Sequence, residues 1–112
     1  MSALYTKYLL EKEGKETLEI KEKGFVTYKL LGDICHICIL FVDSKYRRGN
    51  IARELMDTLL FEKAKDCKAF TACINTKQYD TSKTTIILLR YGFEVVGAEN
   101  GEILLYKDIK KG

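Results

Sequence analysis

The feature that most constrains this chain is a basic, glycine-containing turn that joins an apolar run to an amphipathic helical pattern. Residues 34–42 are almost continuously apolar and rich in β-branched side chains, which is typical of a central strand covered on both faces. Over residues 50–65, apolar side chains recur every three to four positions, which predicts a helix with one buried face. Asn50 suits the N-cap of this helix, because its side-chain oxygen can accept from first-turn N–H groups. The sequence of residues 34–65 therefore predicts a strand, followed by a turn and then a helix.

The same turn, residues 46–53, is a candidate anion site. The first turn of a helix has unpaired backbone N–H groups, and the helix dipole places partial positive charge there. Arg47 and Arg48 stand just upstream and add two fixed charges with forked donors. A phosphate or pyrophosphate is the kind of ligand that such a site binds.

Strand and turn signals predict how the rest of the chain folds around this unit. Asn100-Gly101 is a strong hairpin signal, and residues 82–91 form a second helical pattern that Gly92 closes. Apolar or alternating segments predict about seven strands. These are residues 4–10, 17–20, 25–31, 34–42, 69–74, 93–96 and 103–106. The 112 residues are enough for one core, so we expect a single α+β (α/β) domain over residues 1–112. Strand, helix and strand over residues 34–74 predict a right-handed unit with two parallel strands.

The composition argues against several classes of protein. A net charge of +3 is too mild to indicate a nucleic-acid partner by itself. No apolar run is long enough to cross a membrane, and charged residues stand where a signal peptide would be apolar, so we expect a cytoplasmic protein. The four cysteines lie in apolar stretches and are expected to be reduced and buried. Cys35 and Cys38 are three apart on a strand and point to opposite faces, so we expect no metal.

The turn residues Arg47-Arg48-Gly49-Asn50-Ile51-Ala52 resemble the central motif, [Arg/Gln]-x-x-Gly-x-[Gly/Ala], of the GNAT superfamily of acyl-CoA-dependent N-acyltransferases. Arg47 and Ala52 match, whereas Asn50 stands where the family usually has glycine. Gly92-Phe93 resembles a second family signature, in which a helix ends in Gly-Phe before a strand. The resemblance covers residues 34–106 and implies a GNAT-like central mixed sheet with two main helices.

The resemblance implies acetyl-CoA as co-substrate and an amine as acceptor. The pyrophosphate would lie on the backbone N–H groups of residues 48–52, and the pantetheine arm would run along the strand that ends at residue 42. The helix beginning near residue 81 would contact the pantetheine or the thiol end. The implied cofactor-binding residues are Phe41, Val42, Arg47, Arg48, Gly49, Asn50, Ile51, Ala52, Thr81 and Ser82.

The resemblance also suggests which residues carry the chemistry. His36, the only histidine, lies six residues before Val42, where the histone-acetyltransferase branch has its glutamate base. An imidazole with a pKa of about 6.5 suits a base near neutrality, although a packed strand histidine explains the position equally. Leu88 occupies the position of the family's tyrosine acid. Tyr91, one turn later, either substitutes for that acid or packs at the helix end. A thiol with a pKa of about 8.5 can also leave without an acid.

The acceptor side departs from the family pattern. Two helices usually separate the family's first and second strands and wall the acceptor site, but residues 11–16 leave no room for them. Either the groove is open and suits a protein lysine or a small amine, or a second subunit in a homodimer supplies the wall. Two other classes stay open, a non-catalytic acyl-CoA-binding module and a small basic nucleic-acid-binding domain. The second of these would need exposed aromatics among its lysines.

Overall fold

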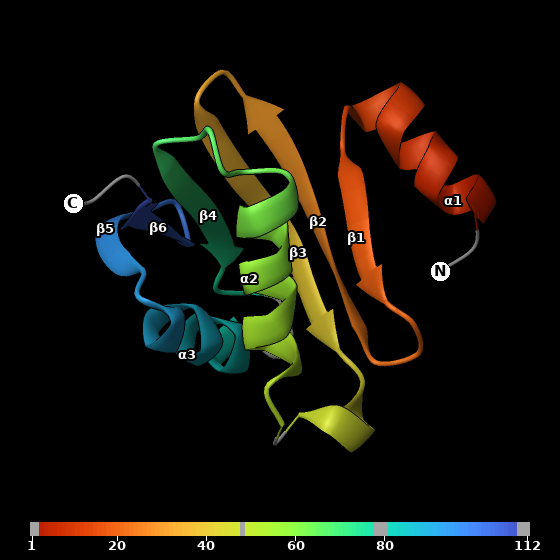
Figure 1. Cartoon of the computed structure of the whole chain (residues 1–112). Coiled ribbons are helices and arrows are strands. Elements are labelled where there is room, and N and C mark those ends of the chain that lie inside the picture. Colours follow the sequence, from red (N-terminus) through yellow and green to blue (C-terminus); the bar gives the residue numbers. More distant parts are fainter. Residues whose placement is uncertain (1–2, 48, 78–80, 110–112) are drawn as a thin grey trace.

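The computed structural model describes residues 3–47, 49–77 and 81–109, with the backbone alone for residues 3, 81 and 82. The described residues form a single mixed sheet of six strands in the order β1-β2-β3-β4-β6-β5 (Figure 1). All neighbours are antiparallel except β3 and β4, which are parallel as predicted. The strands are β1 Glu16–Ile20, β2 Gly24–Leu31, β3 Ile34–Val42, β4 Ala69–Asn75, β5 Glu94–Glu99 and β6 Glu102–Asp108.

Helices lie before, between and after these strands. A short helix α1 (Ala3–Tyr8) continues into a π-helical turn (Leu9–Glu13), and a 3₁₀ turn (Ser44–Tyr46) follows β3. Helix α2 (Ile51–Glu62) contacts β1, β2 and β3, and helix α3 (Thr81–Tyr91) contacts β4 (Figure 1). The α+β class, the parallel βαβ unit and the two main helices are therefore confirmed.

The expectation of about seven strands is wrong, because the first expected strand is helical. The segment 4–10 has apolar side chains at most positions, but only Leu9 is buried, at 2% exposed. Gly14 adopts a left-handed conformation (φ 67°) and its N–H bonds back to the Leu10 carbonyl, so it ends a helix and does not connect two strands. The sheet is thus preceded by one helical segment where we expected a strand.

The core lies between the sheet and its two main helices. Leu55, Met56 and Leu59 of α2 are fully buried, and they share one cluster with Val26 and Tyr28 of β2. Burial of each such side chain contributes about 1.5–3 kcal/mol. The core fixes α2 across the sheet and so determines where its N-terminus points.

The parallel strands β3 and β4 diverge part-way along their length. They pair from Ile34 and Ala69 to Ile37 and Ala72, and no further rung joins them among the described residues. A bulge also interrupts β3, because Thr27 and Tyr28 of β2 face Ile39 and Ile37 and leave one extra residue between them. The far half of β3 therefore has backbone groups on its β4 side that no strand uses.

Candidate functional site

The turn after β3 presents the N-terminus of α2 at the end of the sheet. The Asp43 carboxylate accepts from the Lys45 N–H (2.9 Å), and the Gly49 N–H donates to the Tyr46 carbonyl (3.1 Å). Asn50 lies just before α2 with φ −101°, and its side chain makes no capping hydrogen bond. The backbone at Asn50 therefore does not require glycine, and the first-turn N–H groups stay available to a ligand.

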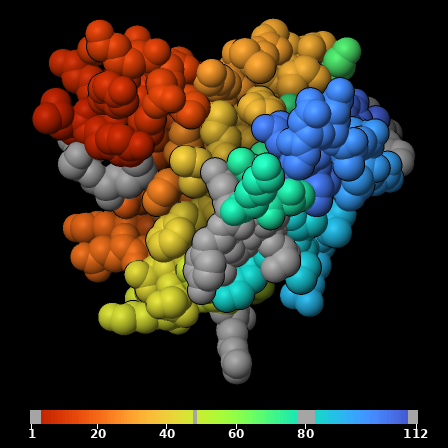
Figure 2. Space-filling model, turned by 180° about the vertical axis from the view of Figure 1, so that it is seen from behind, coloured from red at the N-terminus to blue at the C-terminus, as the bar shows by residue number. Residues whose placement is uncertain are grey.

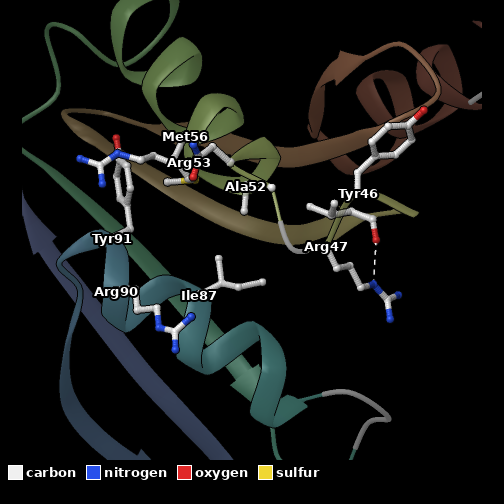
Figure 3. Close-up of a pocket in the computed structure, with 11 residues that line it drawn as sticks. Tyr46, Arg47, Ala52, Arg53, Met56, Ile87, Arg90 and Tyr91 are labelled. Carbon is white, nitrogen blue, oxygen red and sulfur yellow. Dashed lines mark hydrogen bonds between the residues drawn. The ribbon is translucent and has the colours of Figure 1, made fainter. Parts of the chain in front are cut away.

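Two adjacent cavities lie between this turn, α2, α3 and the end of β3. One has a volume of about 230 Å³ and is lined by the turn, the first turns of α2 and the last turns of α3 (Figure 3). The other, of about 330 Å³, lies between β3 and α3. Both are lined by Val42, Arg47, Ile87 and Arg90. A long ligand can therefore run from the helix N-terminus along the open half of β3.

The charges around these cavities are all positive. Among the described residues that line them, the ionised side chains are those of Arg47, Arg53, Lys83 and Arg90, with no carboxylate. Arg53 has an exposed, 3.9 Å contact with Asp57, which leaves most of its donors free for a ligand. The lining thus suits a polyanion.

Arg47 joins the end of β3 to the turn. Its Nε donates to the Val42 carbonyl (3.0 Å; Figure 3). Its guanidinium lies 5.9 Å from the centre of the Phe41 ring. These contacts fix the guanidinium at the boundary of both cavities, with its remaining N–H groups available to an anion. The structure therefore brings Phe41, Val42 and Arg47 together as the resemblance implies.

The other expected cofactor residues contribute mainly backbone. The Ile51 side chain is 9% exposed and belongs to the core, so only its backbone N–H, in the first turn of α2, is left for a ligand. Gly49, Asn50 and Ala52 line the first cavity. Arg48 lies outside the described residues, as do the side chains of Thr81 and Ser82, whose backbone begins α3.

His36 lies on the face of the sheet opposite α2, one rung before β3 and β4 diverge. Its rung partner is Thr71, and its Nδ1 is 2.8 Å from the Thr71 Oγ1. Burial lowers the pKa of the imidazole below its usual value, and the nearby Lys29 and Lys15 lower it further. The imidazole is therefore neutral near pH 7 and can accept a proton.

Leu88 and Tyr91 belong to the core side of α3. Leu88 is completely buried. The Tyr91 hydroxyl donates to the Asp57 carboxylate of α2 (2.8 Å), and burial and this hydrogen bond raise the tyrosine pKa. Tyr91 lines the first cavity and points toward α2 (Figure 3). His36 lies on the other side of the sheet, because its neighbours Cys35 and Ile37 belong to the core beneath α2. The structure does not bring the two expected catalytic side chains together.

Several residues of this region were not predicted. Lys83, Ile87 and Arg90 share one face of α3, and their spacing of four and three residues was a usable helical signal. Thr71 had no such signal, because it meets His36 only through the register of two strands 35 residues apart in sequence.

Three other properties bear on the kind of site. Among the described residues, no group of three or more His, Cys, Asp or Glu side chains is arranged to hold a metal. All four cysteines are free thiols, of which Cys35 and Cys67 are buried and Cys38 and Cys73 are part-exposed. No helix within the described ranges has the length and apolar character needed to span a membrane.

Comparisons with solved structures show the same fold in acetyltransferases. The chain superposes on PaiA N-acetyltransferase from Thermoplasma acidophilum in complex with coenzyme A (TM-score 0.72, 14% identity, 95% of this chain and 69% of that one). It also superposes on the ribosomal-protein-S18-alanine N-acetyltransferase from Escherichia coli (TM-score 0.68, 13% identity, 99% and 79%). A protein of Pyrococcus horikoshii OT3 gives a TM-score of 0.70 (18% identity, 96% and 74%).

Family membership rests on a separate comparison. No curated protein matches the chain by sequence. The family model described as "Acetyltransferase (GNAT) domain" matches residues 3–102, which is most of the chain. The match includes β3, the basic turn, α2 and the Gly92-Phe93 element. The chain therefore belongs to the GNAT acetyltransferase family, whose co-substrate is acetyl-CoA, and is an acetyl-CoA-dependent acyltransferase.

Proposed function

We propose that the chain moves an acetyl group from acetyl-CoA to a primary amine, of a protein lysine or a small molecule, by direct attack, with His36 as the general base. The observation that carries the proposal is the position of His36. It stands on the last-but-one rung before β3 and β4 diverge, on the face opposite the cationic cavities. A cofactor that enters from the cavity side and an amine that enters from the His36 side would meet at the divergence.

The cofactor would bind from the turn toward the divergence. Its pyrophosphate would lie on the N–H groups of the turn and of the start of α2, where the dipole and the arginines favour anions. Its pantetheine amides would pair with backbone groups of β3 beyond Ile37, which no β4 residue in the described part of the chain bonds. The residues that we assign to this binding are Phe41, Val42, Arg47, Arg48, Gly49, Asn50, Ile51, Ala52, Thr81 and Ser82.

The reaction needs one proton acceptor for the attacking amine. The nitrogen attacks the thioester carbonyl, the C–N bond forms, the C–S bond breaks, and CoA leaves as a thiolate. If the Thr71 hydroxyl accepts from Nδ1–H of His36, Nε2 keeps its lone pair and takes the proton from the amine. Thr71 would thus hold the tautomer that a base requires.

The leaving thiolate has no acid at the usual family position, because Leu88 is buried there. Since a thiol has a pKa of about 8.5, the thiolate can leave without one. The Tyr91 hydroxyl donates to Asp57, and we therefore assign Tyr91 a positioning role between α2 and α3.

Two measurements test the proposal. Acetyl-CoA is titrated into the chain by calorimetry, and CoA release is then followed with a polyamine, an aminoglycoside and a lysine peptide as acceptors. We expect binding and acceptor-dependent release. Binding without release on any amine would favour the non-catalytic module, and no binding would contradict the cofactor assignment.

Residues 3–13 are helical, so one helical segment stands before β1 where we expected a strand. The wall of the acceptor side keeps two proposed forms, an open groove beside this segment or a second subunit. Gel filtration with light scattering, run beside the release assay, separates them. A fully active monomer would exclude the homodimer as a requirement for activity.

A further inference from the structure

The face of the sheet that carries His36 bears one polar row across four strands. Lys29 of β2 pairs with His36 of β3, and His36 in turn pairs with Thr71 of β4. Thr71 also pairs with Tyr106 of β6. Residues directly opposite on neighbouring strands lie on the same face, with strands about 4.8 Å apart. Figure 2 views this side of the molecule, with α1 (red) at one edge and β5 and β6 (blue) at the other. The row therefore crosses the sheet beside the point where an acceptor amine would enter.

The charge next to His36 in this row is positive. Lys29 is half-buried, and Lys15 also lies near the imidazole. The Lys15 ammonium is 3.2 Å from the Glu13 carboxylate, whereas Lys29 forms no ion pair within the part of the chain that the structure describes. A simple alkylammonium placed at His36 would be repelled by Lys29. An amine that carries its own negative charge would be attracted.

We propose that Lys29 binds an anionic group of the acceptor, and that the acceptor is a free α-amino acid whose amine faces His36 and whose carboxylate pairs with Lys29. This inference rests on the proposed function and narrows its acceptor. In an α-amino acid the amine and the carboxylate share one carbon, so both can reach the side chains of a single cross-strand pair. A lysine side chain in a protein lacks that carboxylate.

The surface beyond His36 suits an apolar substrate side chain. Ile39 and Phe41 follow His36 along β3 and are 46% and 44% exposed. Phe41 is the rung partner of Phe25, and their ring centres are 5.7 Å apart. Phe41 also lines the second cavity, so this exposed apolar surface runs from His36 to the edge of the proposed cofactor site. Leucine is therefore a suitable probe.

The test compares three probes that differ only at the carboxylate, leucine, leucinamide and isoamylamine, at saturating acetyl-CoA. Lys29→Met keeps most of the apolar stem and removes the charge. We expect it to lower kcat/KM for leucine about tenfold, the usual size for a lost charge-assisted contact. Activity on the other two probes should hold or rise, because the repulsion of their ammonium group is removed. Lys21→Met, in the turn between β1 and β2, is the matched control and should change none of them.

Each outcome bears on the inference, and acetyl-CoA affinity reports that the variants are folded. Equal losses for the three probes, or wild-type turnover of isoamylamine but not of leucine, would overturn the inference and leave the proposed function intact. Lys29→Glu should lower activity on leucine further than Lys29→Met does while activity on isoamylamine holds or rises. If the wild type releases no CoA with the three probes and none with the polyamine, aminoglycoside and lysine peptide, the proposed function and this inference are both overturned.

Discussion

At the scale of single residues, the contact between His36 and Thr71 determines what the imidazole can do. The Nδ1 to Oγ1 distance of 2.8 Å joins β3 to β4 at their last-but-one shared rung. A neutral imidazole has one N–H and one lone pair, so a partner on Nδ1 decides which nitrogen is free. Thr71 is therefore the residue whose change should affect the base without touching the cofactor.

Thr71→Val should lower kcat about five- to tenfold, because losing one hydrogen bond costs about 1 kcal/mol and frees the wrong tautomer. The KM for acetyl-CoA should not change. Thr71→Ser, which keeps the hydroxyl, should restore most of the rate. Steady-state kinetics of the two variants check this, and a Thr71→Val enzyme as fast as the wild type would remove the contact from the mechanism.

The pH dependence of the rate should report the environment of His36. The base must be neutral to act, so kcat should be constant at neutral pH and fall as the pH drops through the His36 pKa. Burial and the nearby lysines hold that pKa below its usual value of about 6.5, so the fall should occur below pH 6.5. Lys29→Met removes one of those charges and should move the fall to higher pH. A kcat that does not fall at low pH would contradict the assignment of His36 as the base. A fall at the same pH in Lys29→Met as in the wild type would contradict the effect of Lys29 on the His36 pKa.

Sequence reasoning located part of the candidate site at this scale. The resemblance pointed to His36 through its offset from Val42 and to Arg47 and its neighbours as candidate anion ligands, because both depend on short spacings along the chain. Thr71 and Lys29 could not be found in this way, because strand register brings them to His36. Register depends on the bulge at residue 38 and on the packing of the whole sheet.

At the scale of elements, the start of α2 is the part of the fold that we propose binds the anion. Asn50 was predicted as its N-cap, and its position is confirmed, but its side chain makes no cap hydrogen bond. The Asn50 side chain therefore adds little to the stability of the helix.

Asn50→Ala should change the free energy of unfolding by less than about 0.5 kcal/mol, whereas loss of a bonded cap costs about 1 kcal/mol. Urea denaturation measures the difference. A loss of 1 kcal/mol or more would show that the side chain caps α2 in solution.

The hydrogen bond between Tyr91 and Asp57 fixes α3 against α2, the two helical walls of the first cavity. Tyr91→Phe should destabilise the chain by about 1 kcal/mol and raise the KM for acetyl-CoA more than it lowers kcat. Asp57→Ala should do the same, and the two changes should be less than additive. A double-mutant cycle by urea denaturation tests this coupling, and full additivity would mean that the bond does not hold the helices.

The N-terminal helix shows where pattern reasoning failed at this scale. Leu4, Tyr5, Tyr8 and Leu10 are exposed, so their apolar character says nothing about a buried face. Leu, Lys and Glu are good helix formers, and Gly14 ends the segment in a conformation that favours a helix terminus. Strands β2, β3 and β4 were predicted well because their side chains do form the core.

At the scale of the whole molecule, the sheet separates two surfaces. One end and face hold the cationic cavities between α2 and α3, and the opposite face holds His36 and the polar row with Lys29. The divergence of β3 and β4 connects them, since none of the described residues beyond Ile37 and Ala72 adds a shared rung to these two strands. Under the proposed function, the two substrates would approach from opposite faces without competing for the same space.

The measurement that tests this account most directly is the rate of CoA release by His36→Gln, taken together with its affinity for acetyl-CoA. Because general-base catalysis contributes about 100-fold or more, kcat should fall by at least that factor. The calorimetric Kd for acetyl-CoA should stay within about twofold, because His36 lies on the face opposite the cavities. An unchanged rate would contradict the account, and so would a loss of acetyl-CoA affinity large enough to explain a slower reaction.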